Sequence, residues 1–276
     1  MTQTAEFDPR TSLPLRVELV RQLRRRRTTL TLGFLVLLPF ILVGAFALSS
    51  GSSNDTYVDL AKSGAVNFTM FTLFASVGFL LVVVVALFFG DTIASEASWG
   101  SLRYLLAMPV PRTRLLRQKL IVAAGYSFAG IVLLPTVALL LGAAVYGWNP
   151  VRTPAGDTYS AWTGVARLAL VVGYIAVTLL LVAGTAFWLS TVTDAPLGAV
   201  GGAVGIVIVS NILDSITALH GWRTILPTHY QFSWTDALAV PATYTAMAKG
   251  CVASLIYSGV FFTAAFRHFS RKDILS

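Results

Sequence analysis

Residues 24–48 read R-R-R-R-T-T-L-T-L-G-F-L-V-L-L-P-F-I-L-V-G-A-F-A-L, four arginines followed by 21 residues without a charged side chain. A helix needs about 20 apolar residues to cross the hydrocarbon of a bilayer, which is roughly 30 Å thick. The stretch therefore predicts a transmembrane helix that begins beside a basic cluster.

Long apolar runs of this kind recur along the whole chain of 276 residues. Charged residues make up 12% of it, about half of the roughly 25% that is usual in a soluble domain. The sequence predicts one transmembrane domain over residues 1–276, with spans at about 29–48, 66–90, 120–146, 168–189, 197–213 and 246–266. A β-barrel is excluded because its strands alternate apolar and polar residues. We expect an all-α integral membrane protein with six transmembrane helices.

The first five predicted spans contain no Asp, Glu, Lys or Arg, and the sixth contains only Lys249. If both termini are cytoplasmic, the inner segments hold 15 of the 20 Lys and Arg residues, and the outer segments hold 5. Short cytoplasmic loops are enriched in these residues. The distribution predicts that orientation.

The arginine cluster itself has two interpretations, a nucleic-acid contact or a membrane anchor that touches anionic lipid. Its position directly before a span favours the anchor. The anchor residues are Arg24, Arg25, Arg26 and Arg27. We expect no nucleic-acid partner.

Residues 12–27 predict an amphipathic helix on the membrane surface. Ser12 suits its N-cap and Pro14 its first turn, although Arg16 falls on the apolar side. At 100° per residue, one side carries Leu15, Leu19, Val20 and Leu23, and the other carries Glu18, Arg21, Gln22 and Arg25. Such a helix is either a lever on the first span or a passive anchor.

The segment between the second and third spans carries the most specific pattern. Residues 91–119 read D-T-I-A-S-E-A-S-W-G-S-L-R-Y-L-L-A-M-P-V-P-R-T-R-L-L-R-Q-K. Residues 92–107 have helical character, which Pro109 and Pro111 stop. We interpret the segment as a docking element that offers Glu96 and Trp99 to a partner. The alternative is an ordinary amphipathic connector.

Two parts of the chain resemble type-2 ABC permeases, the half-size six-span membrane subunits of bacterial exporters. The first is Glu96-x-x-x-Gly100-Ser101-Leu102, followed by Leu105-Leu106-x-x-Pro109-Val110-x-Arg112 and Lys119. The second is the basic ending at residues 266–274, F-R-H-F-S-R-K-D-I. The family more often has Thr at the position of Ser101. The resemblance covers the whole chain in layout, but these segments alone in motif.

The resemblance implies an N-terminal interfacial elbow helix at residues 11–27 and a cytoplasmic coupling helix at 91–108, within a coupling segment at 91–117. The coupling helix would sit in a groove of a separate nucleotide-binding ATPase subunit, which binds ATP and Mg, whereas this chain binds no cofactor. A second permease copy, identical or paralogous, would complete the transporter in the bacterial cytoplasmic membrane. The expected coupling residues are Glu96, Trp99, Gly100, Ser101, Leu102 and Arg103. Alternatively, Glu96 only pairs with Arg103.

Other residues suggest further roles. The small-x-x-x-small pattern of Gly198, Gly201, Gly202 and Gly205 predicts close helix packing, within the chain or at a dimer face. Asn211 either lines a pathway or bonds a neighbouring helix. By the resemblance, residues 214–245 form an extracytoplasmic re-entrant gate. Asp214, His220, Arg223 and His229 lack the spacing of metal ligands, so no metal site is expected.

The sequence contains no G-x-x-x-x-G-K-[ST] phosphate loop, G-x-S-x-G or H-E-x-x-H motif. We therefore expect a transport subunit rather than an enzyme, with an amphipathic small molecule or lipid as cargo. One alternative is a stand-alone secondary transporter or channel. Such proteins usually carry ionisable groups within their spans and inverted repeats, but five of the spans carry no charged residue and no inverted repeat is visible. Another alternative is a membrane anchor or sensor module for a cytoplasmic partner.

Overall fold

The computed structural model describes residues 15–48, 56–98 and 112–271. In this part of the chain, six helical segments are long and apolar enough to cross a membrane. They are α2 (Arg26–Leu48), α5 (Leu80–Ser98), α7 (Arg112–Tyr146), α8 with α9 (Ala161–Thr178 and Leu180–Val192), α10 (Pro196–Ser215) and α11 (Thr245–Arg271). The predicted fold class, an all-α membrane protein with six spans, is confirmed.

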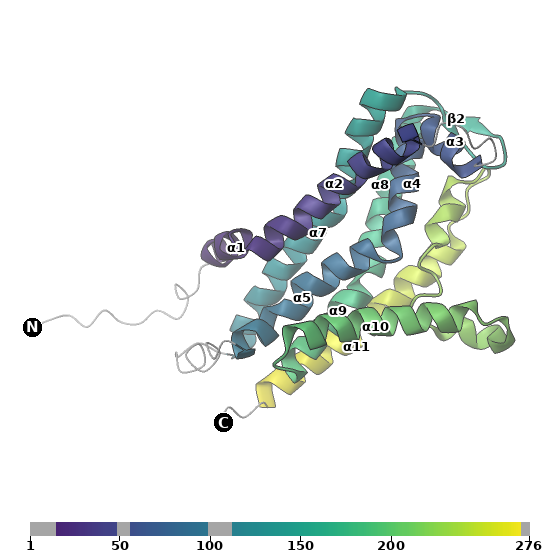
Figure 1. The fold of residues 1–276 in the computed structure, drawn as a ribbon. Helices are drawn as coiled ribbons and strands as arrows, with labels where there is room; N and C mark the ends of the chain where they lie inside the picture. Colours follow the sequence, from purple (N-terminus) through teal and green to yellow (C-terminus); the bar gives the residue numbers. More distant parts are fainter. Residues whose placement is uncertain (1–14, 49–55, 99–111, 272–276) are drawn as a thin grey trace, which may run out of the picture.

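Shorter elements lie between these spans. They are α1 (Leu15–Leu23), α3 (Thr56–Lys62), α4 (Ala65–Val77), the antiparallel strands β1 (Val151–Arg152) and β2 (Thr158–Tyr159), and the 3-10 helices η1 (Thr217–Ile225) and η2 (Ser233–Leu238). Figure 1 shows α1, the end of α5 and the end of α11 at one end of the bundle, with α3 and β2 at the other. The basic end is our name for the end of the bundle that holds α1, the last turns of α5 and α11, and the first turns of α2 and α7.

The helix α5 lies at the centre of the bundle. It packs against α7, α9 and α10. In its most apolar stretch of 18 residues, 72% is buried inside the bundle, compared with 17–39% in the other spans. In the core, Phe89 of α5 contacts Phe187 and Phe262 edge-to-face or tilted. By contrast, α2 exposes large apolar side chains such as Phe34 and Phe40. An apolar surface of this kind is expected where helices face lipid.

Two predicted spans are each made of two helices. The second, predicted as one helix over 66–90, consists of α4 and α5, separated by Gly78 and Phe79. The carbonyl of Val77 at this interruption accepts a hydrogen bond of 2.8 Å from Gln231 Nε2. An interrupted helix inside a membrane needs such a partner for its freed backbone group. The fourth span is similarly divided at Leu179, between α8 and α9.

Helices at the basic end extend further than the hydropathy pattern predicted. The helix α5 continues to Ser98 rather than ending at Gly90, and α7 begins at Arg112 rather than at Leu120. Both added stretches carry charged residues, so the predicted spans ended before them and the stretches were assigned to the cytoplasmic segment between the spans. Glu96 of the first stretch pairs with Lys119 of the second, and Asp91 pairs with Arg25 and Arg27, as described below, so the buried charges of these stretches have partners.

The helix predicted to lie on the membrane surface ends earlier than expected. Within the predicted range 12–27, α1 covers Leu15–Leu23 and α2 already begins at Arg26. Residues 11–14 lie outside the described chain, as does the predicted cap Ser12. The short turn at Arg24 and Arg25 separates the two helices. It allows α1 to leave the axis of α2, as Figure 1 shows.

Candidate functional site: an ionic junction at the basic end

Glu96 lies in the last turns of α5 and is almost fully buried, with 4% of its side chain exposed. Its Oε1 accepts hydrogen bonds from Lys119 Nζ on α7 and, at 2.8 Å, from Arg21 Nη2 on α1. The Lys119 side chain is also buried, with 5% exposed. One carboxylate therefore joins three helices that are far apart in sequence.

The polar side of α1 faces this carboxylate. Glu18 pairs with Arg21 at 2.7 Å and with Lys119 at 3.5 Å. The hydroxyl of Tyr126 on α7 donates to the carbonyl of Leu19 at 2.7 Å. The apolar side chains of the helix, which include Leu19 and Leu23, are exposed. The sequence predicted this division of α1 into an apolar and a charged side.

A second carboxylate lies between the start of α2 and α5. Asp91 accepts from Arg25 Nη1 at 3.0 Å and from Arg27 Nη1 at 2.5 Å. The aspartate side chain is 8% exposed, whereas that of Arg27 is 61% exposed. The turn between α1 and α2 is thereby held on α5. We call these ion pairs, together with those of Glu18, Arg21, Glu96 and Lys119, the ionic junction.

The charges in the junction explain why it can exist beside a membrane. Buried ions are tolerated only when they are paired and hydrogen-bonded. Around Glu96, two carboxylates balance one lysine and one arginine. Burial alone would raise the pKa of Glu18, but the charges of Lys119 and Arg21 outweigh it and hold this pKa below its usual value.

Residues of the ionic junction lie on both sides of residues 99–111, the central part of the predicted coupling segment. The helix α5 leads into residues 99–111, and α7 follows them, so Glu96 and Lys119 flank this stretch on its two sides. Trp99, Gly100, Ser101, Leu102 and Arg103 lie outside the described residues. The alternative pairing of Glu96 with Arg103 is outside them as well.

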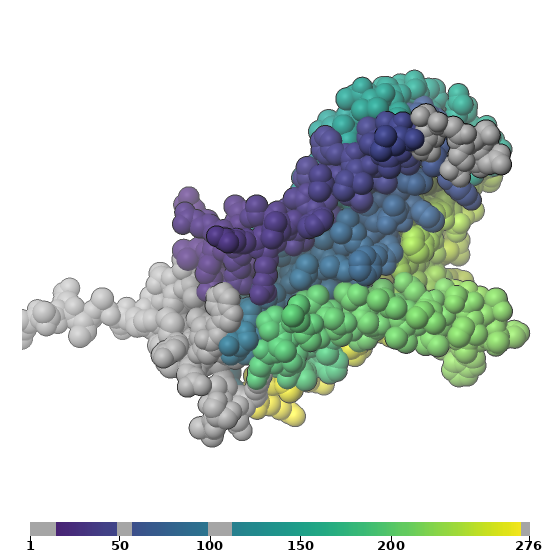
Figure 2. All heavy atoms as spheres, viewed as in Figure 1, coloured from purple at the N-terminus to yellow at the C-terminus, as the bar shows by residue number. Residues whose placement is uncertain are grey.

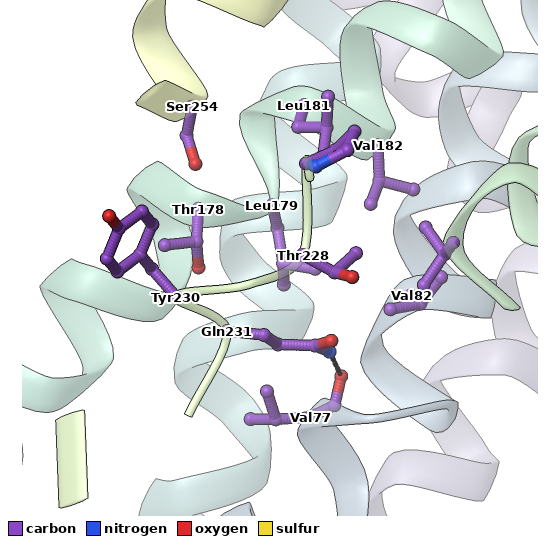
Figure 3. Close-up of a pocket in the computed structure, with 12 residues that line it drawn as sticks. Val77, Val82, Thr178, Leu179, Leu181, Val182, Thr228, Tyr230, Gln231 and Ser254 are labelled. Carbon is purple, nitrogen blue, oxygen red and sulfur yellow. Dashed lines mark hydrogen bonds between the residues drawn. The ribbon is translucent and has the colours of Figure 1, made fainter. Parts of the chain in front are cut away.

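At the opposite end of the bundle, part of the predicted gate segment reaches into the core. Gln231 bonds the Val77 carbonyl, and the hydroxyl of Tyr174 on α8 donates to the carbonyl of Tyr230 at 2.5 Å. Figure 3 shows Gln231 and Thr228 beside a cavity of about 20 Å³, between the interruptions of the second and fourth spans. This volume is enough for about one water molecule.

A family model of the ABC-2 family transporter protein matches residues 20–274 of the chain. The chain belongs to the ABC-2 transporter family. It is therefore the membrane-spanning permease of an ABC transporter, a multi-pass membrane protein that works with an ABC ATPase subunit. No curated protein matches the chain at a significant level.

The arginines of the predicted membrane anchor divide into two pairs in the permease. Arg25 and Arg27 turn to Asp91, whereas Arg24 and Arg26 are exposed. Sequence reasoning did not assign partners to the first pair. Lys119 was noticed only as part of the family pattern. Its position within reach of a buried carboxylate depends on how α7 crosses α5, which no local pattern gives.

The glycines of α10 have different surroundings. A Cβ on Gly202 would lie 2.9 Å from Leu189 Cδ1 of α9, but a Cβ on Gly201 or Gly205 would meet no atom of another described residue within 4 Å. Gly198 would contact only Thr193 and Ala195 before its own helix, at 3.6 Å or more. The helices α5 and α10 approach closely at Gly90 of α5, whose Cβ would lie 2.9 Å from Cγ2 of Val200 on α10. The sequence analysis missed Gly90.

The polar residues at the end of α10 and after it differ in their contacts. Asn211 is half-buried, and its role stays a prediction. Asp214 accepts from His229 Nδ1 at 2.6 Å and lies 3.4 Å from Arg223 Nε. His220 is exposed, and its ring bonds the nearby carbonyl of Ala218. Asp214 is therefore used in an ionic contact within the described chain.

Proposed function

We propose that this permease is the membrane subunit of an exporter, in which a separate ATPase subunit binds ATP and Mg and acts on the permease through residues 91–117. A second permease copy, identical or paralogous, completes the transporter. The cargo is an amphipathic small molecule or lipid. The protein lies in the bacterial cytoplasmic membrane with both termini in the cytoplasm.

The observation that supports this proposal is the ionic junction. A displacement of residues 99–111 pulls on the end of α5 and on the start of α7, because both are covalently continuous with that stretch. Through Glu96 and Lys119 the two helices move together, and Arg21 transmits the movement to α1. The interfacial helix is then a lever rather than a passive anchor.

The orientation is supported by the distribution of charge. The basic end gathers Arg21, Arg25, Arg27 and Lys119. Cytoplasmic flanks are enriched in Lys and Arg. The cargo class is supported by the sparse charge of the spans, since a site for a small ion would require ionisable or polar ligands within them.

The test is to co-express the permease with its cognate ABC ATPase subunit and reconstitute the complex in liposomes. Transport of a fluorescent amphipathic probe should require ATP. Scrambling residues 99–103 should abolish transport while the ATPase subunit alone keeps its basal turnover. Replacing the junction pair with Glu96→Gln and Lys119→Met should uncouple ATP turnover from transport, and Arg117→Met, an exposed position on the same turn of α7, should not.

Each alternative predicts a different result. A stand-alone secondary transporter or channel gives ion-dependent flux in liposomes that contain the permease alone. An anchor or sensor module binds its cytoplasmic partner but gives no flux with or without ATP. Full coupling in the scrambled variant would refute the proposed route of transmission.

A further inference from the structure

A groove lies between α2 and α5, beside the ionic junction. Its volume is about 370 Å³, within the range of roughly 300–1,000 Å³ that is typical of ligand sites. The walls are mainly apolar, and Leu30 and Phe34 of α2 face Val83 and Leu87 of α5 across it. In Figure 2, α2 and α5 both reach the surface on the face toward the viewer.

The length of the groove matches one leaflet of a bilayer. Its wall on α5 runs from Leu80 to Asp91. Eleven residues of helix rise about 16 Å at 1.5 Å per residue. Half of the hydrocarbon core of a bilayer is about 15 Å thick. An acyl chain of the leaflet at the basic end would therefore fit along the groove.

The polar mouth of the groove favours a negative charge. It is lined by Arg25, Arg27, Asp91 and Gln22. The two arginines bond Asp91 through one nitrogen each, Nη1, and a guanidinium has five N–H donors in total. Two positive charges face one negative charge, so donors and a net positive charge remain for an anion.

We propose that the α2–α5 groove is a binding site for an anionic phospholipid. One acyl chain lies between Leu30, Phe34, Val83 and Leu87, and the phosphate accepts hydrogen bonds from Arg27 and Arg25. The open side of the groove supports a lipid as the occupant, because Leu30 and Phe34 are 64% and 62% exposed. The site does not depend on the proposed transport cycle. A lipid there would rest on the turn that joins α1 to α2.

Native mass spectrometry of the delipidated permease, titrated with phosphatidylglycerol or phosphatidylcholine, tests the proposal. The anionic lipid should bind at lower concentration than the zwitterionic one. Arg27→Gln, which leaves the Arg25–Asp91 pair in place, should weaken phosphatidylglycerol binding about fivefold, the upper range for an ion pair at an exposed arginine. Arg117→Gln is the matched control, because this exposed arginine of α7 lies neither in the groove nor in the predicted membrane anchor, and it should keep wild-type binding.

A second variant tests the apolar part of the site without touching the arginines. Leu87→Trp fills the groove and should reduce binding of phosphatidylglycerol, whereas Leu37→Trp, on an exposed part of α2 away from the groove, should not. Equal binding of the two lipids, equal loss in Arg117→Gln and Arg27→Gln, or unchanged binding in Leu87→Trp would each overturn the proposal. So would a dimer in the same spectra that Leu87→Trp dissociates, because the occupant would then be a second copy.

Discussion

The buried pair of Lys119 and Glu96 gives the sharpest test of the ionic junction. Replacing Lys119 with methionine keeps most of the side-chain volume but leaves a buried carboxylate with one cation fewer. Breaking one partner of a buried ion pair costs about 3–5 kcal/mol. Arg21 remains 2.8 Å from Glu96 and, although its side chain is 47% exposed, it still offsets part of the charge of the carboxylate. We therefore expect the free energy of unfolding to fall by an amount near the lower limit, about 3 kcal/mol.

The free energy of unfolding can be measured by titrating SDS into mixed micelles and following helicity by circular dichroism. The matched control is Arg117→Met, an exposed residue half a turn away, which should change stability by less than about 0.5 kcal/mol. The double variant Lys119→Met with Glu96→Gln should be more stable than the sum of the single losses by about 1–3 kcal/mol, since neither charge is then left without its partner.

The result that would refute this reasoning is equal stability of Lys119→Met and Arg117→Met. Additive losses in the double variant would also contradict it, because they would mean that the two buried side chains act independently. Either result would leave α5 and α7 joined by apolar packing alone.

Three further predictions concern other parts of the chain. The pKa of Glu18 is lower in the folded protein than in the unfolded chain, where it is about 4.3, so its ion pairs stabilise the fold fully above that pH. This stabilisation is lost as the pH falls through the lower folded pKa. In a pH titration, the difference in free energy of unfolding between wild type and Glu18→Gln should disappear over that range. Gly90→Ala should cost about 1–3 kcal/mol by forcing α5 and α10 apart, and Gly201→Ala should be neutral or stabilising in the same SDS titration. Gln231→Leu should lower the free energy of unfolding by about 1–3 kcal/mol, because it leaves the buried Val77 carbonyl unsatisfied. Hydrogen exchange of the amides near Gly78 should increase in this variant. Unchanged exchange there would contradict the prediction.

The sequence predicted the features that depend on local composition. Runs such as residues 29–48 identify spans because length and hydropathy decide whether a helix enters a bilayer. The amphipathic pattern of α1 likewise located its polar side. Neither needed knowledge of which helices are neighbours.

Features that depend on neighbours were missed. Asp91 was assigned to the start of the cytoplasmic coupling segment because a carboxylate ends an apolar run, but it lies within α5, where it pairs with Arg25 of the α1–α2 turn and with Arg27 of the first turn of α2. The division of the second span could not be seen because Gly78 and Phe79 are unremarkable within an apolar run. The Val77 carbonyl at the interruption is bonded by Gln231, which lies 154 residues away in the sequence. The small-residue pattern of α10 indicated close packing, but the tight contact with α5 is made by Gly90.

The bond between Val77 and Gln231 has a consequence for biosynthesis. When α4 and α5 leave the ribosome, the glutamine that donates to the Val77 carbonyl has not yet been made, because it lies 154 residues further along the chain. The nascent second span must therefore enter the membrane before this hydrogen bond exists, and the bond forms only after translation has passed the fifth span. In nascent chains arrested before Gln231, the Val77 carbonyl lacks this donor, so insertion of the early hairpin and completion of the bundle are separate events in time.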